Sequence, residues 1–500
     1  MMKLLLLMMN LNNIKMDIKD KLKPVPIGNK VKPNFTKDQE IAVNGLIDFI
    51  SAPYSEKDYR RGLIGAAGTG KTFVLKYIIN NCSLSHSVIG LAAPTHKACR
   101  VLREATKLSA ATVQSDLGLR LNFNVENFDI NNPPFDPMGK IKIDKFALYI
   151  IDEASMINRG LLTFIERECK RVKCKIIYVG DESQLAPVGE LYSPAFKGVK
   201  TFKLEQIIRQ GDDNPISYLL ELLRKDIKNN TFTFLSYIGK NDSKFNETGD
   251  KGYCVFSASK FPEIVEREFN TEEFVNNIDL SKVVGFTNVC VNSWNTFIRN
   301  SIVKDANKSI ITKHDLITSY VTIVDDFNDA IIKNSEEYII KDVVNYTHSK
   351  YELEGFMVRF IAVHGGTVTS PLFVLNHTHK ESLVKYYQIC NAYVNDAKSA
   401  SKALRGAKWK EYYKFKDSVL LLTNIGDSNG KIIIGRDLDY GFAITSHKSQ
   451  GSTYNVSLVD VNDIVYDKFG QPYTNAEEIN RRLYVACSRA KNKLYLKYGY

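Results

Sequence analysis

Residues 65–72 read GAAGTGKT and fit the pattern G-x-x-x-x-G-K-[ST]. Residues 61–64 (RGLI) predict a short strand before this loop, and residues 73–79 (FVLKYII) predict a helix after it. A strand, a glycine-rich turn and a helix N-terminus form a phosphate cradle, because backbone N–H groups point at the anion and the helix dipole favours it. Lys71 adds a positive charge, and Thr72 offers a hydroxyl to Mg²⁺. The stretch predicts an α/β fold that binds a nucleoside triphosphate, but it does not say how the energy of hydrolysis is used.

The composition is that of an ordinary globular protein with several domains. The chain has 500 residues, of which 44% are hydrophobic and 25% charged. This length predicts three or four domains or subdomains. The net charge of +11 indicates a polyanionic partner, with nucleic acid the leading candidate. A basic surface that serves only solubility is the alternative reading of the same charge.

The cysteines and the N-terminus point to a cytoplasmic protein. The eight cysteines are scattered, and only Cys169 and Cys174 lie close together, so we expect reduced thiols and no zinc set. The first residues, MMKLLLLMMNLNN, carry an apolar run too short to span a bilayer and no cleavage site. We therefore expect residues 1–27 to be a flexible leader, with Met16 as an alternative start, and no membrane association.

Two α/β patterns run along the chain. In the first half, residues 88–93, 146–151 and 175–179 are apolar runs typical of strands, each followed by a turn and polar or helical sequence. They predict an open, mostly parallel sheet that binds its ligands at the carboxyl ends of the strands. A second pattern begins at residues 281–286 and resumes after Phe442. A domain interrupted by an insertion is the simplest account.

Three other segments interrupt these patterns. Residues 119–145 are rich in Asn, Pro and Asp and predict an inserted loop or hairpin. Residues 311–345 are β-rich. Residues 378–418 are helical in pattern and crowded with Lys and Tyr, together with Trp409.

Carboxylates and an amide follow two of the predicted strands. Residues 148–155 read LYIIDEAS, so that Asp152 could hold Mg²⁺ and Glu153 could polarise the attacking water. We expect this strand to run beside the strand that enters the loop. Residues 177–185 read IYVGDESQL, where the Gln184 amide could sense the γ-phosphate.

Arginines and a basic turn mark three further segments. Residues 204–210 (LEQIIRQ) place Arg209 at the end of a mainly apolar stretch, where it could stabilise charge on a γ-phosphate. Residues 443–453 (AITSHKSQGST) predict a strand that passes into a basic turn containing Gly451. Residues 483–490 (LYVACSRA) predict a short helix that carries Arg489.

Seven segments in this order resemble those of superfamily 1 nucleic-acid helicases: GAAGTGKT, APTHKA, IIDEAS, VGDESQL, IRQ, ITSHKSQGST and YVACSRA. The resemblance spans about residues 33–498, and the ordered set is highly specific. The SHKSQGS form is similar to that of the RecD/Dda branch. The THKA after Pro94 and the Lys/Tyr/Trp-rich helical insertion are most similar to Dda.

The resemblance implies two tandem RecA-like P-loop domains with two insertions. In the implied order, a leader (1–27) comes first. RecA-like domain 1A (28–118 and 146–210) follows and is interrupted by subdomain 1B (119–145), a β-hairpin pin. RecA-like domain 2A (211–310 and 435–500) is interrupted by subdomain 2B (311–434), an SH3-like β-barrel with a helical tower.

The resemblance also implies ATP and Mg²⁺ as cofactors. Thr72 and Asp152 would hold the metal, and Gln39 would read the adenine edge. The implied ATP contacts are Gln39, Gly65, Ala66, Ala67, Gly68, Thr69, Gly70, Lys71, Thr72 and Gly451. The implied catalytic residues are Lys71, Glu153, Gln184, Arg209 and Arg489, with Arg489 supplied by the second domain. Because Arg489 could engage only on closure, hydrolysis would drive a motor.

The implied DNA contacts lie on both domains, where hydroxyls, amides and basic groups suit phosphates. They are Pro94, Thr95, His96, Thr112 and Ser115 on the first domain and Asn288, His447 and Lys448 on the second. Gln114 stands where this family often carries histidine, which weakens it as a contact. In the pin, Phe135 is the candidate strand-separating wedge and Phe128 its competitor.

The function implied by the resemblance is an ATP-dependent DNA helicase that moves 5′ to 3′ on single-stranded DNA. It would act as a monomer on single-stranded and forked DNA in phage replication or recombination, with single-strand-binding and replication proteins as candidate partners. An RNA or RNA–DNA helicase and a translocase that strips proteins without unwinding are the alternatives.

Overall fold

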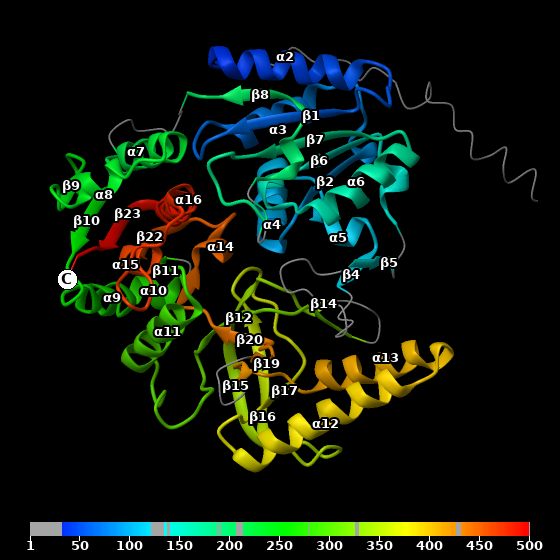
Figure 1. Cartoon of the computed structure of the whole chain (residues 1–500), viewed down its shortest axis with the longest axis vertical. Helices are drawn as coiled ribbons and strands as arrows, with labels where there is room; N and C mark the ends of the chain where they lie inside the picture. The colour runs from blue at the N-terminus through cyan, green and yellow to red at the C-terminus, as the bar shows by residue number, and fades with distance from the viewer. Residues whose placement is uncertain are drawn as a thin grey trace, which may run out of the picture. The chain divides into compact units, whose positions relative to one another are not determined.

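The computed structural model describes residues 33–121, 135–137, 141–187, 190, 192–206, 214–278, 280–325, 330–426 and 432–499. The chain forms two compact units, unit 1 (Met1–Asp212) and unit 2 (Asp213–Tyr500). Figure 1 labels the helices and strands of both.

Unit 1 contains a six-stranded parallel sheet in the order β3-β2-β6-β7-β1-β8. Its strands are β1 (Arg60–Gly65), β2 (Ile89–Ala93), β3 (Ala111–Thr112), β6 (Leu148–Ile151), β7 (Lys175–Gly180) and β8 (Lys200–Leu204). The parallel α/β sheet predicted from the apolar runs is confirmed. The expectation that the Asp152 strand runs beside the loop strand is wrong, because β7 lies between β6 and β1.

Helices cover both faces of this sheet, so its central strands are mostly buried and apolar, whereas the edge strand β8 exposes Lys200 and Lys203. On one face α2 (Lys37–Ser51), α3 (Lys71–Asn81) and α4 (His96–Thr106) build the core with side chains such as Leu46, Ile78 and Leu102. On the other face α5 (Val113–Asp116) and α6 (Arg159–Arg171) do so. Short 3-10 turns occur at His86–Val88, Ile143–Lys145, Ala154–Met156 and Pro194–Phe196.

The predicted pin segment contributes one antiparallel strand pair. Strands β4 (Leu119–Leu121) and β5 (Phe135–Pro137) pair so that Leu121 lies opposite Phe135. Residues 122–134, including Phe128, lie outside the described residues, and so does the side chain of Phe135. The role of this segment as a pin stays a prediction.

Unit 2 contains a second sheet, in the order β21-β11-β22-β23-β10-β9, which is parallel except for the β9–β10 pair. Its strands are β9 (Ser243–Phe245), β10 (Gly252–Phe256), β11 (Ser281–Gly285), β21 (Ala443–Thr445), β22 (Tyr454–Asp460) and β23 (Ala490–Lys497). Since β11 and β21 are neighbours although about 160 residues separate them, the predicted interrupted domain is confirmed. Strands β9 and β10 precede the predicted start of this pattern.

Helices cover both faces of the unit 2 sheet as well. One face carries α7 (Ile216–Asn229), α8 (Thr233–Ile238), α15 (Val461–Val465) and α16 (Ala476–Cys487). The other carries α9 (Phe261–Phe269), α10 (Glu272–Asn276) and α11 (Asn288–Ile302). The short helix α14 (Ser446–Ser449) follows β21 directly.

The insertion between β11 and β21 has its own β-sheet, in the order β17-β16-β15-β12-β20, all antiparallel. These strands are β12 (Leu316–Ser319), β15 (Glu337–Thr347), β16 (Glu354–Ala362), β17 (Leu372–Leu375) and β20 (Leu438–Tyr440). Two smaller pairs join β13 (Ile323–Val324) to β14 (Ala330–Ile332) and β18 (Ile425–Gly426) to β19 (Ile432–Ile434). The β-structure extends well past the predicted 311–345. An SH3-like barrel stays a prediction.

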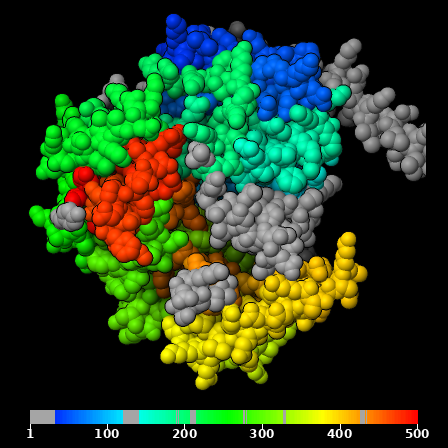
Figure 2. Space-filling view, viewed as in Figure 1, coloured from blue at the N-terminus to red at the C-terminus, as the bar shows by residue number. Residues whose placement is uncertain are grey.

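The helical stretch predicted over 378–418 is confirmed as two adjacent helices. They are α12 (Lys380–Ser399) and α13 (Lys402–Ser418), which pack side by side (Figure 1). Figure 2 shows these two helices, in yellow, exposed along one edge of unit 2. Their core contacts come from Tyr386, Cys390 and Phe415.

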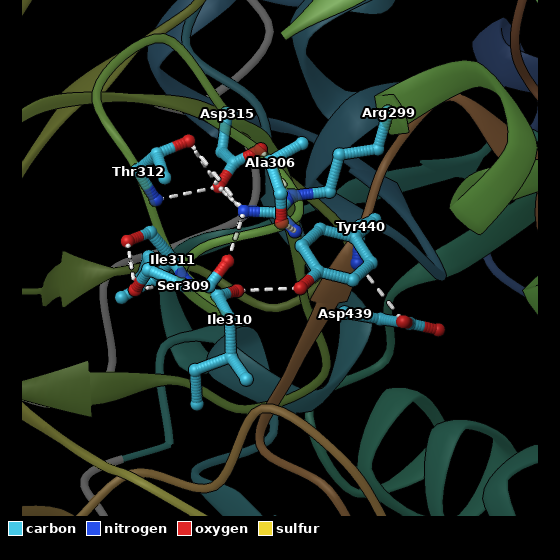
Figure 3. Close-up of polar contacts among 9 residues, drawn as sticks. All are labelled: Arg299, Ala306, Ser309, Ile310, Ile311, Thr312, Asp315, Asp439 and Tyr440. Carbon is cyan, nitrogen blue, oxygen red and sulfur yellow. Dashed lines mark hydrogen bonds and ion pairs between the residues drawn. The ribbon is translucent and has the colours of Figure 1, made fainter. Parts of the chain in front are cut away.

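Buried ion pairs fasten the insertion to the parallel sheet of unit 2. Lys282 of β11 is fully buried, and its Nζ donates to Glu337 Oε1 of β15 at 2.7 Å and to the Gly441 carbonyl at 2.6 Å. Arg299 of α11 pairs with Asp315 at 2.7 Å and stacks on the Tyr440 ring at 4.8 Å (Figure 3). Because buried charges are tolerated only when paired, each pair fixes the position of its two elements.

All eight cysteines are free thiols, and six of them are buried. Within the described part of the chain, no helix combines the length and apolarity that crossing a membrane requires.

Candidate nucleotide and nucleic-acid site

The candidate site residues of unit 1 lie at one edge of its sheet. Because β1, β2, β3, β6 and β7 are parallel, their carboxyl ends meet at the same edge. The loop at residues 65–72 follows β1, Asp152 and Glu153 follow β6, and Gln184 lies in the turn after β7. The structure therefore brings these predicted residues together, although they come from three separate segments.

The loop before α3 requires glycine at Gly70. Gly70 is the N-cap of α3 with φ of 83°, the left-handed region that L-residues rarely adopt. A Cβ at this position would lie 2.5 Å from Nε2 of Gln39. The backbone of Gly70 thus leaves room for the Gln39 amide directly over the loop.

Lys71 and Thr69 hold the loop closed on itself. Lys71 Nζ donates to the carbonyls of Gly65 at 2.6 Å and Ala66 at 3.0 Å. The Thr69 hydroxyl donates to the same Ala66 carbonyl at 2.9 Å. These contacts place the Lys71 charge inside the loop, at the N-terminus of α3, where a bound anion gains from both the charge and the helix dipole.

Gln39 sits against the loop and begins α2. Thr36 and Gln39 form a capping box, in which the Thr36 hydroxyl accepts from Gln39 N and the Gln39 side chain accepts from Thr36 N. The Gln39 Nε2 donates to the Thr69 carbonyl at 3.0 Å, and the side chain is buried. The predicted adenine contact is thus locked to the loop backbone, and adenine recognition by Gln39 stays a prediction.

Asp152 is a buried carboxylate at the end of β6. Burial raises its pKa, while the Glu153 N–H, which donates to it at 2.9 Å, and the charge of Lys71 act in the opposite direction. Such a carboxylate, whose charge is costly without a positive neighbour, fits a cation. Thr72 lies in the first turn of α3, and its role as a second oxygen ligand stays a prediction. One carboxylate and one hydroxyl suit Mg²⁺, which takes the rest of its shell from phosphates and water.

Glu153 and Gln184 complete the edge. Glu153 has φ of 51°, an uncommon conformation for a non-glycine residue that turns the chain sharply after the strand. Gln184 is buried, and its backbone N–H donates to the carbonyl of Asp181 at 3.2 Å. Arg209 lies outside the described residues, although Asp38 fixes the segment before it by accepting from the backbone N–H groups of Glu205 and Gln206.

The candidate DNA contacts of unit 1 follow β2 and β3. The Thr95 hydroxyl caps α4 by accepting from Ala98 N at 3.2 Å, so Pro94, Thr95 and His96 form the strand-to-helix turn. The Thr112 hydroxyl caps α5 by accepting from Ser115 N at 3.3 Å. Both hydroxyls therefore already accept a hydrogen bond from the start of a helix.

The candidate DNA contacts of unit 2 follow two adjacent strands. Gly285 of β11 lies opposite Thr445 of β21, so Asn288, which begins α11, and Lys448 of α14 leave the same sheet edge. His447 lies near the Phe286 ring, with centroids 6.4 Å apart. Burial lowers the pKa of His447 and Arg482 lowers it further, while Glu478 acts in the opposite direction, so the surroundings favour the neutral ring.

Arg489 lies inside unit 2 and organises the loop that contains Gly451. Its guanidinium donates to the carbonyls of Val485, Ser452 and Ser449 and to the Ser488 hydroxyl. Gly451 has φ of 73° at the centre of this loop, which only glycine adopts without strain. Arg489 is thus a joint between α16 and the turn after α14.

Three residues that the sequence reasoning passed over also shape these edges. Asp181 turns the chain toward Gln184 by accepting from Ser183 N at 2.9 Å. Asp463 clamps the turn after β11, accepting from the N–H groups of Phe286 and Thr287 at 2.6 and 2.9 Å and from the Thr287 hydroxyl at 2.6 Å. Lys142 donates to Ser115 Oγ at 3.3 Å. Asp181 lies in the same motif as the predicted residue Gln184, whereas Asp463 and Lys142 are far in sequence from the residues that they contact.

Comparisons with known proteins agree with the motif order. The family model described as "AAA domain" matches residues 48–240. An uncharacterised protein, R530 of Acanthamoeba polyphaga mimivirus, is 24% identical over 92% of this chain and 99% of its own length. The ATP-dependent DNA helicase Dda of Enterobacteria phage T4 is 26% identical over 56% of this chain and 60% of its own length.

A solved structure of similar extent is that of the Bacteroides Pif1 helicase in complex with ADP-AlF3 and ssDNA. It is 15% identical, with a TM-score of 0.47, over 93% of this chain and 92% of that one. The seven ordered motifs and the sequence relatives agree: the chain is similar to superfamily 1 helicases of the branch that contains Dda and RecD.

Proposed function

We propose that this chain is an ATP-dependent DNA helicase that translocates 5′ to 3′ on single-stranded DNA and unwinds duplexes in phage replication or recombination. The observation that carries the proposal is the convergence of Lys71, Asp152, Glu153 and Gln184 at one edge of a parallel sheet. The relative Dda, a DNA helicase by name, supports DNA as the substrate.

The predicted site residues divide the hydrolysis chemistry among them. The loop N–H groups and Lys71 bind the phosphates, and Thr72 and Asp152 would hold Mg²⁺, which would supply positive charge to offset that of the phosphates. Glu153 accepts the proton of the attacking water, and Gln184 orients that water or the γ-phosphate. Arg209 and Arg489 would stabilise charge that develops in the transition state.

Arg489 must leave its present partners to act in this way. Its donors are held by carbonyls of the loop that contains Gly451, so each engagement with a phosphate exchanges these hydrogen bonds for charge-assisted ones. We infer that this exchange couples the nucleotide state to the shape of the turn after β21, which carries His447 and Lys448.

Partial duplexes with a 5′ or a 3′ single-stranded tail test the direction of movement. We expect ATP-dependent unwinding of the 5′-tailed substrate and little of the 3′-tailed one. Activity confined to the 3′-tailed substrate would overturn the direction while leaving the helicase assignment in place.

Two alternatives have their own outcomes. Equal stimulation of ATP hydrolysis by RNA and DNA of the same sequence would favour an RNA or RNA–DNA helicase. Displacement of a bound protein from single-stranded DNA, without unwinding of either tailed duplex, would favour a translocase that strips proteins.

A further inference from the structure

Two side chains of the insertion in unit 2 meet the predicted DNA contacts Asn288 and Lys448. Strands β12 and β20 pair antiparallel, with Ser319 opposite Leu438. The residue after β12, Tyr320, and a residue just before β20, Arg436, therefore lie at the same end of the insertion sheet. That end faces the starts of α11 and α14.

Lys448 rests on the face of the Tyr320 ring. Its Nζ lies 2.9 Å from the ring centroid, and the Arg436 guanidinium lies 4.4 Å from the same centroid. Both cations are thus held by one aromatic ring, an arrangement that is stabilising only when an anion offsets the repulsion between them. Among the described residues that surround Tyr320, Arg436 and Lys448, Asp439 supplies a negative charge, in an ion pair with Arg436 at 2.6 Å.

Arg436 also holds the start of α11. Its guanidinium donates to Asn288 Oδ1 at 3.1 Å, Asn292 Oδ1 at 3.2 Å and the Tyr320 hydroxyl at 3.0 Å. Its backbone N–H donates to Asn424 Oδ1 at 2.8 Å, which fixes the residue from behind. The Asn288 amide therefore has its oxygen turned to Arg436, which leaves its NH₂ group as the donor for a ligand.

We propose that Tyr320 and Arg436 are positioning residues that set Lys448 and the Asn288 amide for one backbone phosphate of the single strand, so that the insertion forms part of the DNA site. The inference rests on the proposed function. The cluster holds two cations and one carboxylate, and a phosphate would supply the missing negative charge.

The protonation of Lys448 supports this arrangement. Burial lowers the pKa of Lys448 to about 7, Arg436 lowers it as well, and Asp439 opposes them. A phosphate favours the protonated form and would raise this pKa again. DNA binding would then take up a proton, and affinity would fall as the pH rises above about 7. Tyr320 stays neutral throughout, because burial raises the pKa of its hydroxyl far above this range.

Binding of a fluorescent oligo(dT) to the full chain tests the proposal, measured by anisotropy over a range of salt concentrations. Tyr320→Leu should weaken binding about tenfold, because the cation–π contact that holds Lys448 is lost. The slope of log K against log salt should fall by about 0.7, the value for one phosphate contact on a single strand. Tyr320→Phe keeps the ring and should bind nearly as well as the original chain.

Two comparisons separate positioning from packing. Lys448→Ala should show the same loss of slope, and the double variant Tyr320→Leu/Lys448→Ala should be no worse than Lys448→Ala alone. Tyr346→Leu, which removes an exposed tyrosine of the same insertion sheet, should leave binding unchanged. Thermal unfolding of each variant identifies any that fails to fold.

The outcomes that overturn the inference are distinct from those that overturn the function. An unchanged salt slope in folded Tyr320→Leu, or additive losses in the double variant, means that the cluster only joins the insertion to the sheet. Failure of the original chain to bind any single strand removes the proposed function itself.

Discussion

At the scale of single residues, the nucleotide loop depends on one lysine for charge and one glycine for space. Lys71 Nζ donates to two loop carbonyls, and its positive charge acts to lower the pKa of Asp152. Lys71→Ala should lower ATP hydrolysis about a hundredfold or more, because the phosphates lose their charged donor. It should abolish translocation while leaving affinity for single-stranded DNA largely intact.

Phosphate release and DNA anisotropy measure the two effects of Lys71→Ala separately. Lys76→Ala is the matched control, since Lys76 is exposed on the same helix. Retained hydrolysis in the Lys71 variant would mean that the loop is not the site of chemistry.

Gly70→Ala tests the room that glycine leaves for Gln39. The left-handed φ of 83° costs an alanine about 1–2 kcal/mol, and the new Cβ would also displace the Gln39 amide. Gly198→Ala is the control, because Gly198 has φ of 69° and nothing within 4 Å of a Cβ. We expect similar losses of stability in urea unfolding but weakened ATP binding only in Gly70→Ala. If Gly70→Ala and Gly198→Ala bind ATP equally well, Gln39 does not contribute to ATP binding.

At the scale of elements, Lys175 closes the C-terminus of α2. It begins β7, and its Nζ donates to the carbonyls of Phe49 at 2.6 Å, Ile50 at 3.1 Å and Ala52. Lys175→Met should cost about 1–3 kcal/mol in urea unfolding, because helix-end carbonyls are left buried without donors. Lys200→Met, at an exposed position of β8, should cost almost nothing. If Lys175→Met leaves the free energy of unfolding unchanged, water satisfies these carbonyls instead.

The strand pair β4–β5 permits a clean test of the predicted pin. Because Leu121 lies opposite Phe135, a two-residue Asn-Gly turn can replace residues 122–134 without moving either strand. We expect the variant to lose unwinding of a 5′-tailed duplex while DNA still stimulates its ATP hydrolysis. Unwinding at the original rate would show that these residues, Phe128 among them, are not the pin.

Strands and helices whose own residues show a clear hydrophobic pattern could be predicted from the sequence. Features that depend on contacts with residues far away in the sequence could not. The apolar runs at β2, β6 and β7 predicted buried parallel strands, because a strand that is buried on both faces does not alternate apolar and polar residues. The order of the strands was wrong at β6, since local sequence does not record which strand lies beside another. Strand β9 was passed over because its three exposed residues give no apolar run. Strand β10 does carry a short apolar run, residues 253–256, which the sequence reasoning missed.

The same limit applies to the candidate site. The loop, Asp152 and Gln184 could be predicted because each lies within a contiguous motif. Tyr320 and Arg436 could not, because they are more than a hundred residues apart and adjoin Lys448 only through the pairing of β12 with β20.

At the scale of the whole molecule, the insertion of unit 2 is joined to the parallel sheet through buried charge. Removing one partner of the Lys282–Glu337 pair leaves the other buried and uncompensated, which costs about 3–5 kcal/mol. Lys282→Met should therefore be strongly destabilising, whereas Lys282→Met/Glu337→Leu should regain most of the loss. Urea unfolding of the full chain measures both. A double variant as unstable as the single one would show that the Gly441 carbonyl is the critical acceptor.

The joint between insertion and sheet has a mechanical consequence. A load applied to α12 and α13 would reach β11 and α11 through the Lys282–Glu337 and Arg299–Asp315 pairs, which join the insertion to the parallel sheet. These buried ion pairs therefore make a rigid connection between the insertion and the sheet. A force that DNA exerts on α12 and α13 would therefore displace the turns that carry Asn288 and Lys448.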